Sequence, residues 1–170
     1  ESVGFAKTQD IIDKLQEFKE SGKFIYSYID FGSESQYIRA LPSDSIFMPK
    51  EGMLEMNGYG VATLFMEELF SKIGINFHVV GFEDFKSAAE SLSRREFSDS
   101  AEYQLRVLIE QRLSTLGDNT GEFRDMDPGD FQEAISRGLY SADTLMKYGF
   151  IDAIAQEADV KEMMRKKIYG

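Results

Sequence analysis

The stretch "FIYSYIDFGSESQYIRALPSDSIFMPKEGMLEM", residues 24–56, decides the fold class of this chain. It opens with a run of aromatic and β-branched residues, Phe24 to Ile29, which is typical of a strand. A short helix is expected at Ser35 to Leu41, and two further strands are expected at Ser45 to Met48 and at Met53 to Met56. Strands that alternate with helices in this way indicate a layered α/β fold.

Further helices are expected on both sides of this stretch. Upstream, Thr8 is expected to cap a helix whose inner stripe is Ile11, Leu15 and Phe18, and Gly22 is expected to end it. The polar, turn-rich segment 117–130 is expected to be a connection. The other expected elements are a helix at 61–73, a strand at 75–80, a helix at 84–94, a long helix at 101–116 capped by Ser98, short helices at 131–137 and 141–148, and a last helix at 159–168.

Length and composition predict a single domain, residues 1–170, with no internal linker. A chain of 170 residues with 42% hydrophobic and 13% aromatic content can bury roughly 70% of its unfolded surface. The chain starts at Glu1 without a methionine, and its last helical pattern ends just before Gly170. We therefore expect it to be a piece of a longer protein.

Charge and cysteine content exclude several classes of function. The formal net charge of −11 disfavours nucleic acid or an anionic lipid surface as the main partner, because both require a positively charged face. The sequence contains no cysteine, which excludes disulfides, thiolate nucleophiles and cysteine metal sites. No apolar run approaches the ~20 residues that span a bilayer, so this piece is expected to be soluble.

Three features of the sequence suggest catalytic, cofactor or metal chemistry, but each lacks a residue that this chemistry needs. His78 is the single histidine and has no acid or cysteine near it in sequence, which favours a structural role. The "NGYGV" stretch at 57–61 lacks the third glycine of a dinucleotide fingerprint, since Thr63 stands there. The "DMDPGD" stretch at 125–130 resembles a calcium loop, yet Ser136 occupies the position that needs a bidentate glutamate. No cofactor and no metal are therefore expected.

Lys86 lies in "GFEDFKSAAESLSRREFS", residues 81–98, which predicts a turn followed by a helix. The lysine falls about 100° round the helix from Phe85 and so borders the apolar stripe. Glu90 at i+4 and Glu83 at i−3 could hold it in a solvated ion pair. A desolvated amine that accepts a proton is the alternative, because burial disfavours the ammonium form. The stripe itself comprises Phe85, Ala88, Ala89 and Leu92.

The stretch "VVGFEDFKSAAESLSRREFS", residues 79–98, resembles the segment that carries the general-base lysine in the signal peptide peptidase A (protease IV) family. These are membrane-attached serine peptidases with a Ser-Lys dyad. The family's K-S-A-x-E run falls on Lys86, with Ser87, Ala88 and Glu90 at its other positions. The resemblance covers nearly the whole chain, because four further stretches resemble successive family segments in the same order. These stretches are "LQEFKESGKFIYSYID", "SDSIFMP", "NGYGVATLFMEELFSKIGI" and "YSADTLMKYGFIDAI".

More narrowly, the chain resembles the amino-terminal half of the long form, in which the first half supplies the lysine and the second half the serine. Single-half members carry their nucleophile in an A-S-G-G-Y run. Here that run reads "SESQY", so Glu34 holds the nucleophile position and Ser35 the next glycine position. Gly58 stands where single-half members have a serine that orients the lysine. The resemblance therefore implies Lys86 as general base, supporting positions at Ser87, Glu90 and Gly58, and no nucleophile in this chain.

The resemblance also implies an α/β fold of the ClpP/crotonase type that lacks its first strands and a glycine-rich turn. It implies a peptidase that degrades signal-peptide remnants and other apolar peptides. The implied partners are the missing serine-bearing half, peptide substrates and further copies in a ring-like oligomer. A segment outside this chain would anchor the protein in a bacterial inner membrane, with the catalytic part outside the cytoplasm, or in a plastid membrane.

Two other classes of function stay open. In the first, the chain is a structural half that only builds the oligomer, and Lys86 forms a surface ion pair with Glu90. Its test is whether Lys86 titrates well below an ordinary lysine. In the second, the chain belongs to an acyl-CoA enzyme of the crotonase type, which would hold a thioester oxyanion with paired backbone N–H groups. That hypothesis rests on likeness of fold alone.

Overall fold

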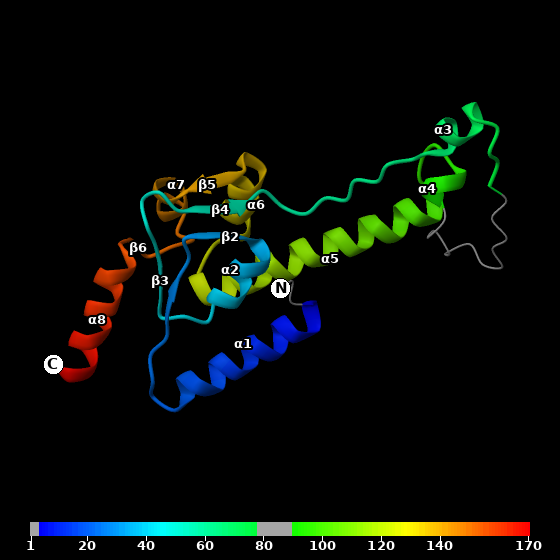
Figure 1. The fold of residues 1–170 in the computed structure, drawn as a ribbon. Helices are drawn as coiled ribbons and strands as arrows, with labels where there is room; N and C mark the ends of the chain where they lie inside the picture. Colours follow the sequence, from blue (N-terminus) through cyan, green and yellow to red (C-terminus); the bar gives the residue numbers. More distant parts are fainter. Residues whose placement is uncertain (1–3, 78–89) are drawn as a thin grey trace. The chain divides into compact units, whose positions relative to one another are not determined.

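A computed structural model describes residues 4–77 and 90–170, whose helices and strands alternate along the chain (Figure 1). The result is a mixed α/β fold, as the sequence predicts. In chain order, the elements are α1 (Phe5–Glu20), β1 (Tyr26–Tyr28), β2 (Phe31–Ser33), α2 (Glu34–Ala40), β3 (Ser45–Met48), β4 (Met53–Met56), α3 (Glu67–Lys72), α4 (Glu90–Ser93), α5 (Asp99–Arg124), α6 (Pro128–Arg137), β5 (Leu139–Ser141), α7 (Ala142–Lys147), β6 (Ala153–Ile154) and α8 (Glu157–Tyr169).

The described strands form two three-stranded sheets. The first has the order β1-β3-β6 and is parallel, with Tyr26 opposite Ser45. The second has the order β2-β4-β5, in which β2 and β4 are parallel and β4 and β5 antiparallel. Consecutive strands alternate between the sheets, since β1 and β3 belong to the first and β2 and β4 to the second. The pairing of β2 with β4 brings the start of α2 close to the end of β4, where the candidate site lies.

The chain divides into two compact units, residues Glu1–Gly58 with Thr115–Gly170, and residues Tyr59–Ser114. The first unit contains both sheets and most of the buried side chains. Burial of each large apolar side chain contributes about 1.5–3 kcal/mol, so this core supplies most of the stability. Its largest fully buried members are Tyr37, Phe150, Ile12, Leu41, Ile46, Met48, Leu54, Met56, Leu116 and Leu145.

The second unit contains α3, α4 and the first part of α5. Its local contacts include the backbone N–H of Met66, which donates to the carbonyl of Ser91 at 2.7 Å, and the rings of Phe65 and Phe97, whose centroids are 5.0 Å apart. Many apolar side chains of this unit nevertheless face solvent. The large exposed ones are Val61, Leu64, Leu69, Ile73, Ile75, Phe77, Tyr103 and Leu108.

The first helix begins earlier than the sequence predicts, so the expected cap at Thr8 is wrong. The helix starts at Phe5 with Gly4 as its N-cap. Thr8 is buried within the first turns, and its hydroxyl donates to the carbonyl of Gly4 at 3.3 Å. A threonine that bonds back to a carbonyl four residues earlier is a helix-interior arrangement. The helix ends at Glu20, just before Gly22.

The segment around α3 also differs from its prediction. The helix expected at 61–73 covers only Glu67–Lys72, because residues 61–66 have no helical hydrogen bonding. Val61 and Thr63 are β-branched and favour an extended backbone, and α3 has no buried residue to hold a longer helix in place. The expected strand 75–80 is absent over its described part, 75–77, and its remainder lies outside the described residues.

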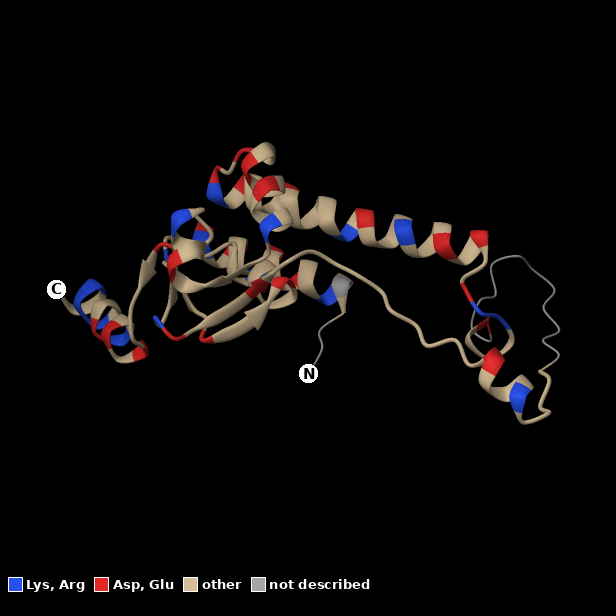
Figure 2. Cartoon of the chain, turned by 90° about the horizontal axis from the view of Figure 1, so that it is seen from above, with Lys and Arg blue, Asp and Glu red and all other residues tan. Residues whose placement is uncertain are grey.

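Helix α5 is longer than predicted and replaces most of the expected connection at 117–130. It begins at Asp99, and the Ser98 hydroxyl accepts the N–H of Ala101 at 3.2 Å, which confirms the predicted cap. It continues to Arg124 because Leu116 and Thr120 are fully buried, and tertiary packing outweighs low helix propensity. Along α5, Lys and Arg residues are interspersed with Asp and Glu (Figure 2).

The three remaining strands, β2, β5 and β6, are not predicted by the sequence. Each is two or three residues long, which is too short for a periodic pattern to appear. In contrast, β3 and β4 have the predicted bounds, and β1 lies within the predicted 24–29.

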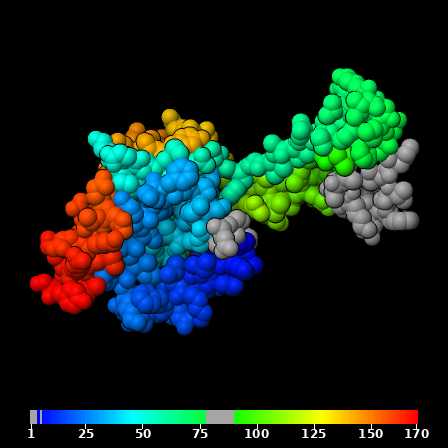
Figure 3. All heavy atoms as spheres, viewed as in Figure 1, coloured from blue at the N-terminus to red at the C-terminus, as the bar shows by residue number. Residues whose placement is uncertain are grey.

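Helix α8 packs against the segment that precedes and includes β1 (Figure 3). The Lys167 ammonium lies 4.4 Å from the ring centroid of Phe24 and 5.0 Å from that of Tyr26. Cation–π contacts of this kind are worth about 0.5–1 kcal/mol at exposed sites. In the described part of the chain, no helix is both long enough and apolar enough to cross a membrane.

Candidate functional site

The candidate site begins where β2 passes directly into α2. Ser33 is the N-cap of α2, and both its N–H and its hydroxyl donate to the Gln36 side-chain oxygen, at 3.0 and 2.6 Å. This contact satisfies groups that would otherwise be unpaired at the helix start. Glu34 is the first residue of the helix, and only 5% of it is exposed.

The Glu34 carboxylate is held by the backbone that follows β4. Its Oε1 atom accepts the N–H of Asn57 and the N–H of Gly58, each at 2.8 Å. Burial of a carboxylate is unfavourable unless polar groups replace its water, and hydrogen bonds to a charged acceptor are roughly twice as strong as neutral ones. These two N–H groups therefore compensate the buried charge.

The Asn57 side chain extends this network to the surface. Its amide lies 2.9 Å from the hydroxyl of Tyr140. All groups are satisfied when the amide oxygen accepts from Tyr140 and the amide nitrogen, 3.2 Å from Glu34 Oε1, donates to the carboxylate. Tyr140, Asn57 and Glu34 then form a continuous chain of hydrogen bonds.

Gly58 adopts a backbone conformation that favours glycine, with φ +82°. A Cβ at this position would also lie 3.4 Å from Cγ2 of Ile135. Residues with a side chain pay an energetic cost for this left-handed backbone. The glycine therefore permits the turn that directs two consecutive N–H groups toward Glu34.

Of the predicted site residues, Glu34 and Gly58 are brought into contact by the fold. Lys86 and Ser87, together with His78, lie outside the described residues. Ser33 is engaged in the cap of α2, and Ser35 is exposed, with its carbonyl accepting from Arg39 at 2.7 Å.

Glu90, the first residue of α4, is engaged at the start of α5. Its carboxylate accepts the N–H of Ser98 at 3.0 Å and the hydroxyl of Ser98 at 2.5 Å. Partial burial acts to raise its pKa, but the hydrogen bonds from Ser98 and the charge of Arg94 outweigh burial and lower the pKa of Glu90 below its usual value. Glu90 is thus an ionised group that links α4 to the cap of α5.

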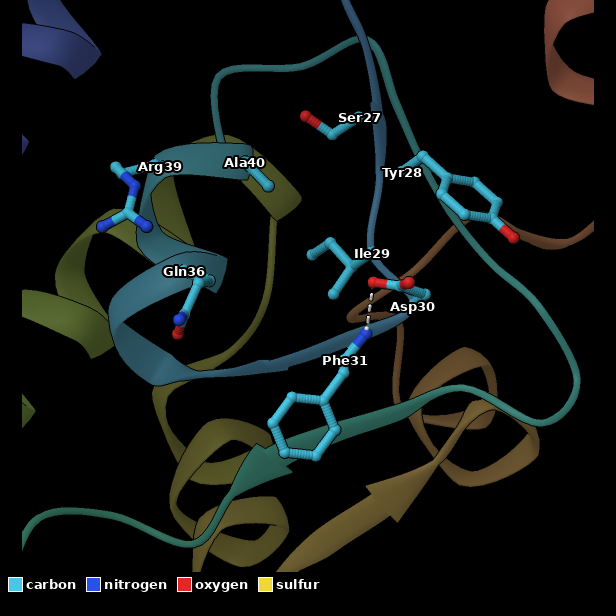
Figure 4. Close-up of a pocket in the computed structure, with 8 residues that line it drawn as sticks. All are labelled: Ser27, Tyr28, Ile29, Asp30, Phe31, Gln36, Arg39 and Ala40. Atoms are coloured by element: carbon cyan, nitrogen blue, oxygen red, sulfur yellow. Dashed lines mark hydrogen bonds between the residues drawn. The ribbon is translucent and has the colours of Figure 1, made fainter. Parts of the chain in front are cut away.

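A hollow of about 240 Å³ lies beside β1, β2 and α2 (Figure 4). Gln36 and Arg39 extend from α2 around it, and Phe31 extends from β2 with 67% of its surface exposed. Among the described strands, β1 pairs with β3 alone and β2 with β4 alone, so both present a free edge. The lining residues are Ser27, Tyr28, Ile29, Asp30, Phe31, Gln36, Arg39 and Ala40.

A partly buried polar cluster that the sequence does not predict ties α5 to the first sheet. Arg124 donates two hydrogen bonds to the Asp152 carboxylate, at 2.8 and 3.0 Å, and Asp152 in turn accepts the N–H of Ile46 at 2.7 Å. Burial acts to lower the pKa of Arg124, but Asp152 outweighs it and the net shift is upward. Burial also raises the pKa of Tyr37, whose hydroxyl donates to the Phe150 carbonyl at 2.9 Å. These fixed groups are suited to structure, not to proton transfer.

Within the ranges 4–77 and 90–170, no group of three or more His, Asp or Glu residues is arranged to hold a metal ion. The polar groups described above find their partners within the protein.

Comparison with known proteins gives consistent results. The family model of Peptidase family S49 matches residues 17–168. The chain is 28% identical over 167 residues to "Serine protease SPPA, chloroplastic" of Arabidopsis thaliana, an alignment that covers 98% of this chain and 25% of that protein. It is 27% identical over 163 residues to "Protease 4" of Salmonella typhi, covering 90% and 26%. The chain thus spans about a quarter of the length of these two relatives.

Proposed function

Since this chain belongs to peptidase family S49, we propose that it supplies the general base of a serine peptidase and that Lys86 is this base. We propose that the nucleophilic serine lies on another segment of a longer protein. The chain spans about a quarter of the length of its relatives, which is consistent with such a segment. In this proposal the chain is the lysine-bearing part of a divided Ser-Lys dyad.

The observation that carries the proposal is the state of Glu34. Glu34 holds the position at which the single-half members of the family, which the chain otherwise resembles, carry their nucleophilic serine. Its carboxylate is buried and accepts two backbone N–H groups, so its oxygen is already engaged. A residue so bound is an anchor and not a nucleophile, which supports a serine from outside residues 1–170.

In the proposed mechanism, the neutral amine of Lys86 accepts the serine hydroxyl proton while the serine oxygen attacks the scissile carbonyl. The resulting ammonium then gives its proton to the leaving amine. In deacylation, the neutral amine accepts a proton from water as the water oxygen attacks the acyl carbonyl. The bond between the acyl carbon and the serine oxygen then breaks, and the ammonium gives its proton to that oxygen, which restores the serine hydroxyl and the neutral amine. Lysine can do this near neutral pH only if its surroundings disfavour the ammonium form.

Two features of the described chain support this setting. Apolar residues stand on both sides of the Lys86 segment in the sequence, with Ile75 and Phe77 before it and Leu92 after it. Ile75 and Phe77 are exposed in this chain, so in this proposal they exclude water only when the serine-bearing half covers them. Glu90 has two hydrogen bonds from Ser98, which favours an anchoring role for Glu90 over a surface ion pair with Lys86. Ser87 and Gly58 remain proposed supporting positions.

We further propose that the fold is of the ClpP/crotonase type, with its first strands on a preceding segment. The alternation of consecutive strands between two sheets supports this assignment. Paired backbone N–H groups in the acyl-CoA alternative would need to face a substrate, whereas the pair at Asn57 and Gly58 binds Glu34.

The proposed substrates are apolar peptides such as signal-peptide remnants. An extended apolar peptide could pair with a free strand edge, and Phe31 is exposed at the edge of the second sheet. The proposed setting is a membrane, either bacterial, with the catalytic part outside the cytoplasm, or plastid, reached through a segment outside this chain. The exposed apolar side chains of the second unit support a homo-oligomer and contact with the serine-bearing half.

The test is Lys86→Met in the full-length protein, with turnover of an apolar peptide as the readout. Methionine keeps an apolar stem and removes the proton acceptor, so we expect turnover to fall by about 10²–10⁴-fold with the folded state retained. Lys72→Met is the matched control, since Lys72 is exposed and pairs with Glu68 on the same short helix. Full activity in Lys86→Met would favour the structural-half alternative instead.

A further inference from the structure

Asn57 and Gly58 are the single Asn-Gly pair in the sequence, since Asn76 is followed by phenylalanine and Asn119 by threonine. The side-chain amide of asparagine is chemically labile in such a pair. Glycine has no Cβ to keep the preceding side chain away from its backbone nitrogen, so the two groups can approach closely. Asn57 is also exposed, so water has access to its side chain.

The reaction open to this pair is loss of the side-chain amide as ammonia. The backbone nitrogen of Gly58 loses its proton and attacks Cγ of Asn57, which closes a succinimide ring. The bond between Cγ and the side-chain nitrogen then breaks, and that nitrogen leaves as ammonia with the proton that Gly58 gave up. Water opens the ring at either of its carbonyls, which yields aspartate or isoaspartate.

Glu34 opposes the first step of this reaction. Its Oε1 atom accepts the Gly58 N–H at 2.8 Å and the Asn57 N–H at the same distance. A carboxylate so close disfavours a second negative charge on the Gly58 nitrogen, because like charges repel strongly where little water separates them. Loss of the proton also breaks a charge-assisted hydrogen bond. Glu34 thus keeps the attacking nitrogen protonated.

The Asn57 side chain is held at both of its polar atoms, which opposes the second step. Its oxygen accepts from the Tyr140 hydroxyl at 2.9 Å, and its nitrogen lies 3.2 Å from Glu34 Oε1 and 3.2 Å from the Gly58 carbonyl oxygen, donating to both. Attack by Gly58 requires the side chain to rotate until Cγ meets the backbone nitrogen. That rotation breaks these hydrogen bonds, and breaking them is unfavourable.

We propose that Asn57 is a deamidation site that Glu34 and Tyr140 protect, so that the folded turn sets the rate at which the amide becomes a carboxylate. A carboxylate at residue 57 would face that of Glu34 where a hydrogen bond now joins the two side chains, and this repulsion destabilises the turn. The change runs in one direction, because the amide nitrogen has left as ammonia. The proposal is independent of the role of Lys86.

The test follows the peptide that contains Asn57 by mass spectrometry, in the full-length protein kept in mildly alkaline buffer. In Glu34→Ala, conversion to aspartate and isoaspartate should accelerate by about 10- to 100-fold, because the charge and its hydrogen bonds are lost. Glu34→Gln should accelerate it by less than about 10-fold, since its amide oxygen still accepts both N–H groups. Tyr140→Phe removes one neutral hydrogen bond and should accelerate it by about 2- to 10-fold. The matched control is Glu133→Gln, an exposed glutamate that pairs with Arg137 in the same unit, and it should leave the rate unchanged.

Two comparisons separate protection by the turn from a general loss of structure. In denaturant, all variants should convert Asn57 at the same rate, because the turn is absent. In native buffer, Asn119 of α5 should react at an unchanged rate in every variant, since its side chain donates to the Thr115 carbonyl in the same unit, away from the turn. Equal acceleration at Asn57 and Asn119 would assign the effect to unfolding and overturn the proposal.

Asn57→Asp tests the consequence of the reaction. Amide exchange at Gly58 should accelerate by about 10-fold or more, because the new carboxylate repels that of Glu34 and weakens its contact with the turn. Asn57→Ala is the uncharged control, which keeps both backbone N–H groups and should accelerate exchange less. Equal exchange in the two variants would contradict the proposed effect of deamidation on the turn.

An unchanged rate of conversion in Glu34→Ala would overturn the proposed protection. A slower rate would overturn it as well, because Glu34 would then be the base that takes the proton from Gly58. If Glu34→Ala fails to fold, Glu34→Gln and Tyr140→Phe decide the matter. Faster conversion of Asn57 in either folded variant supports the proposal, and wild-type rates in both contradict it.

Discussion

At Glu34, burial and backbone hydrogen bonding act on the same oxygen atom. Rotation of this carboxylate toward a substrate would leave the N–H groups of Asn57 and Gly58 unpaired, and an unpaired buried donor costs about 1–3 kcal/mol. The preference for the anchored state therefore follows from the structure of the turn. Gly58 contributes to the anchored state through its left-handed backbone, which permits the turn that directs the two N–H groups toward Glu34.

The turn predicts a measurable loss of stability for Gly58→Ala. The left-handed backbone at φ +82° and the contact with Ile135 should lower the free energy of unfolding by about 1–2 kcal/mol, measured by urea denaturation. Gly60→Ala is the control, because no heavy atom lies within 4 Å of a Cβ there and its φ is not positive. Equal stability of the two variants would show that Gly58 does not hold this turn.

Among the elements, the junction of α4 and α5 has a pH dependence with a definite sign. The pKa of Glu90 is lowered in the folded state, so its ionised form contributes stability above the ordinary glutamate pKa of about 4.3. This contribution is lost as the pH falls through the lower folded pKa. The difference in unfolding free energy between wild type and Glu90→Gln should therefore shrink from about pH 5 toward pH 3.

A double-mutant cycle separates this effect from general acid sensitivity. In a Ser98→Ala background, the hydroxyl that donates to Glu90 and caps α5 is absent, so Glu90→Gln should change stability much less at every pH. A pH dependence that is as large in the Ser98→Ala background would contradict the assignment to this pair.

How far the sequence predicts these elements depends on where their stability originates. Strands β3 and β4 are predicted with the observed bounds because their apolar runs are local signals. The strands β2, β5 and β6 escape prediction because pairing between distant residues creates them. The extension of α5 through Gly117 and Gly121 likewise comes from packing of Leu116 and Thr120 in the core, which no local pattern encodes.

The candidate site, too, is predicted from the sequence only in part. The resemblance drawn from short motifs is confirmed by the match to Peptidase family S49, and it singled out both Glu34 and Gly58. Their contact joins residues that are 24 positions apart and follows from the pairing of β2 with β4. Asn57 and Tyr140 carry no motif of their own, so only the fold reveals their part in the network. The role of Lys86 stays a prediction.

At the scale of the whole molecule, the two units differ in how they bury apolar groups. The first contains the core, whereas Leu64 and Ile73 in the second are 77% and 63% exposed. Exposed apolar surface of this kind marks an interaction site. We expect the chain to self-associate at high concentration in sedimentation experiments, and Leu64→Glu combined with Ile73→Glu to weaken that association.

Ile168→Glu provides the comparison for this prediction. Ile168 is an exposed apolar residue of α8 in the first unit, so its replacement should leave the association unchanged. A chain that stays monomeric at high concentration, or an association that depends equally on Ile168, would argue against the second unit as the interacting surface.

The central claim is that residues 1–170 carry the base of the dyad and no nucleophile, and labelling with a serine-directed fluorophosphonate tests it most directly. We predict that the full-length protein is labelled at one serine outside these residues, and that Lys86→Met suppresses this labelling. The isolated 170-residue chain should remain unlabelled. Label on Ser33, Ser35 or any other serine of residues 1–170 would contradict the claim.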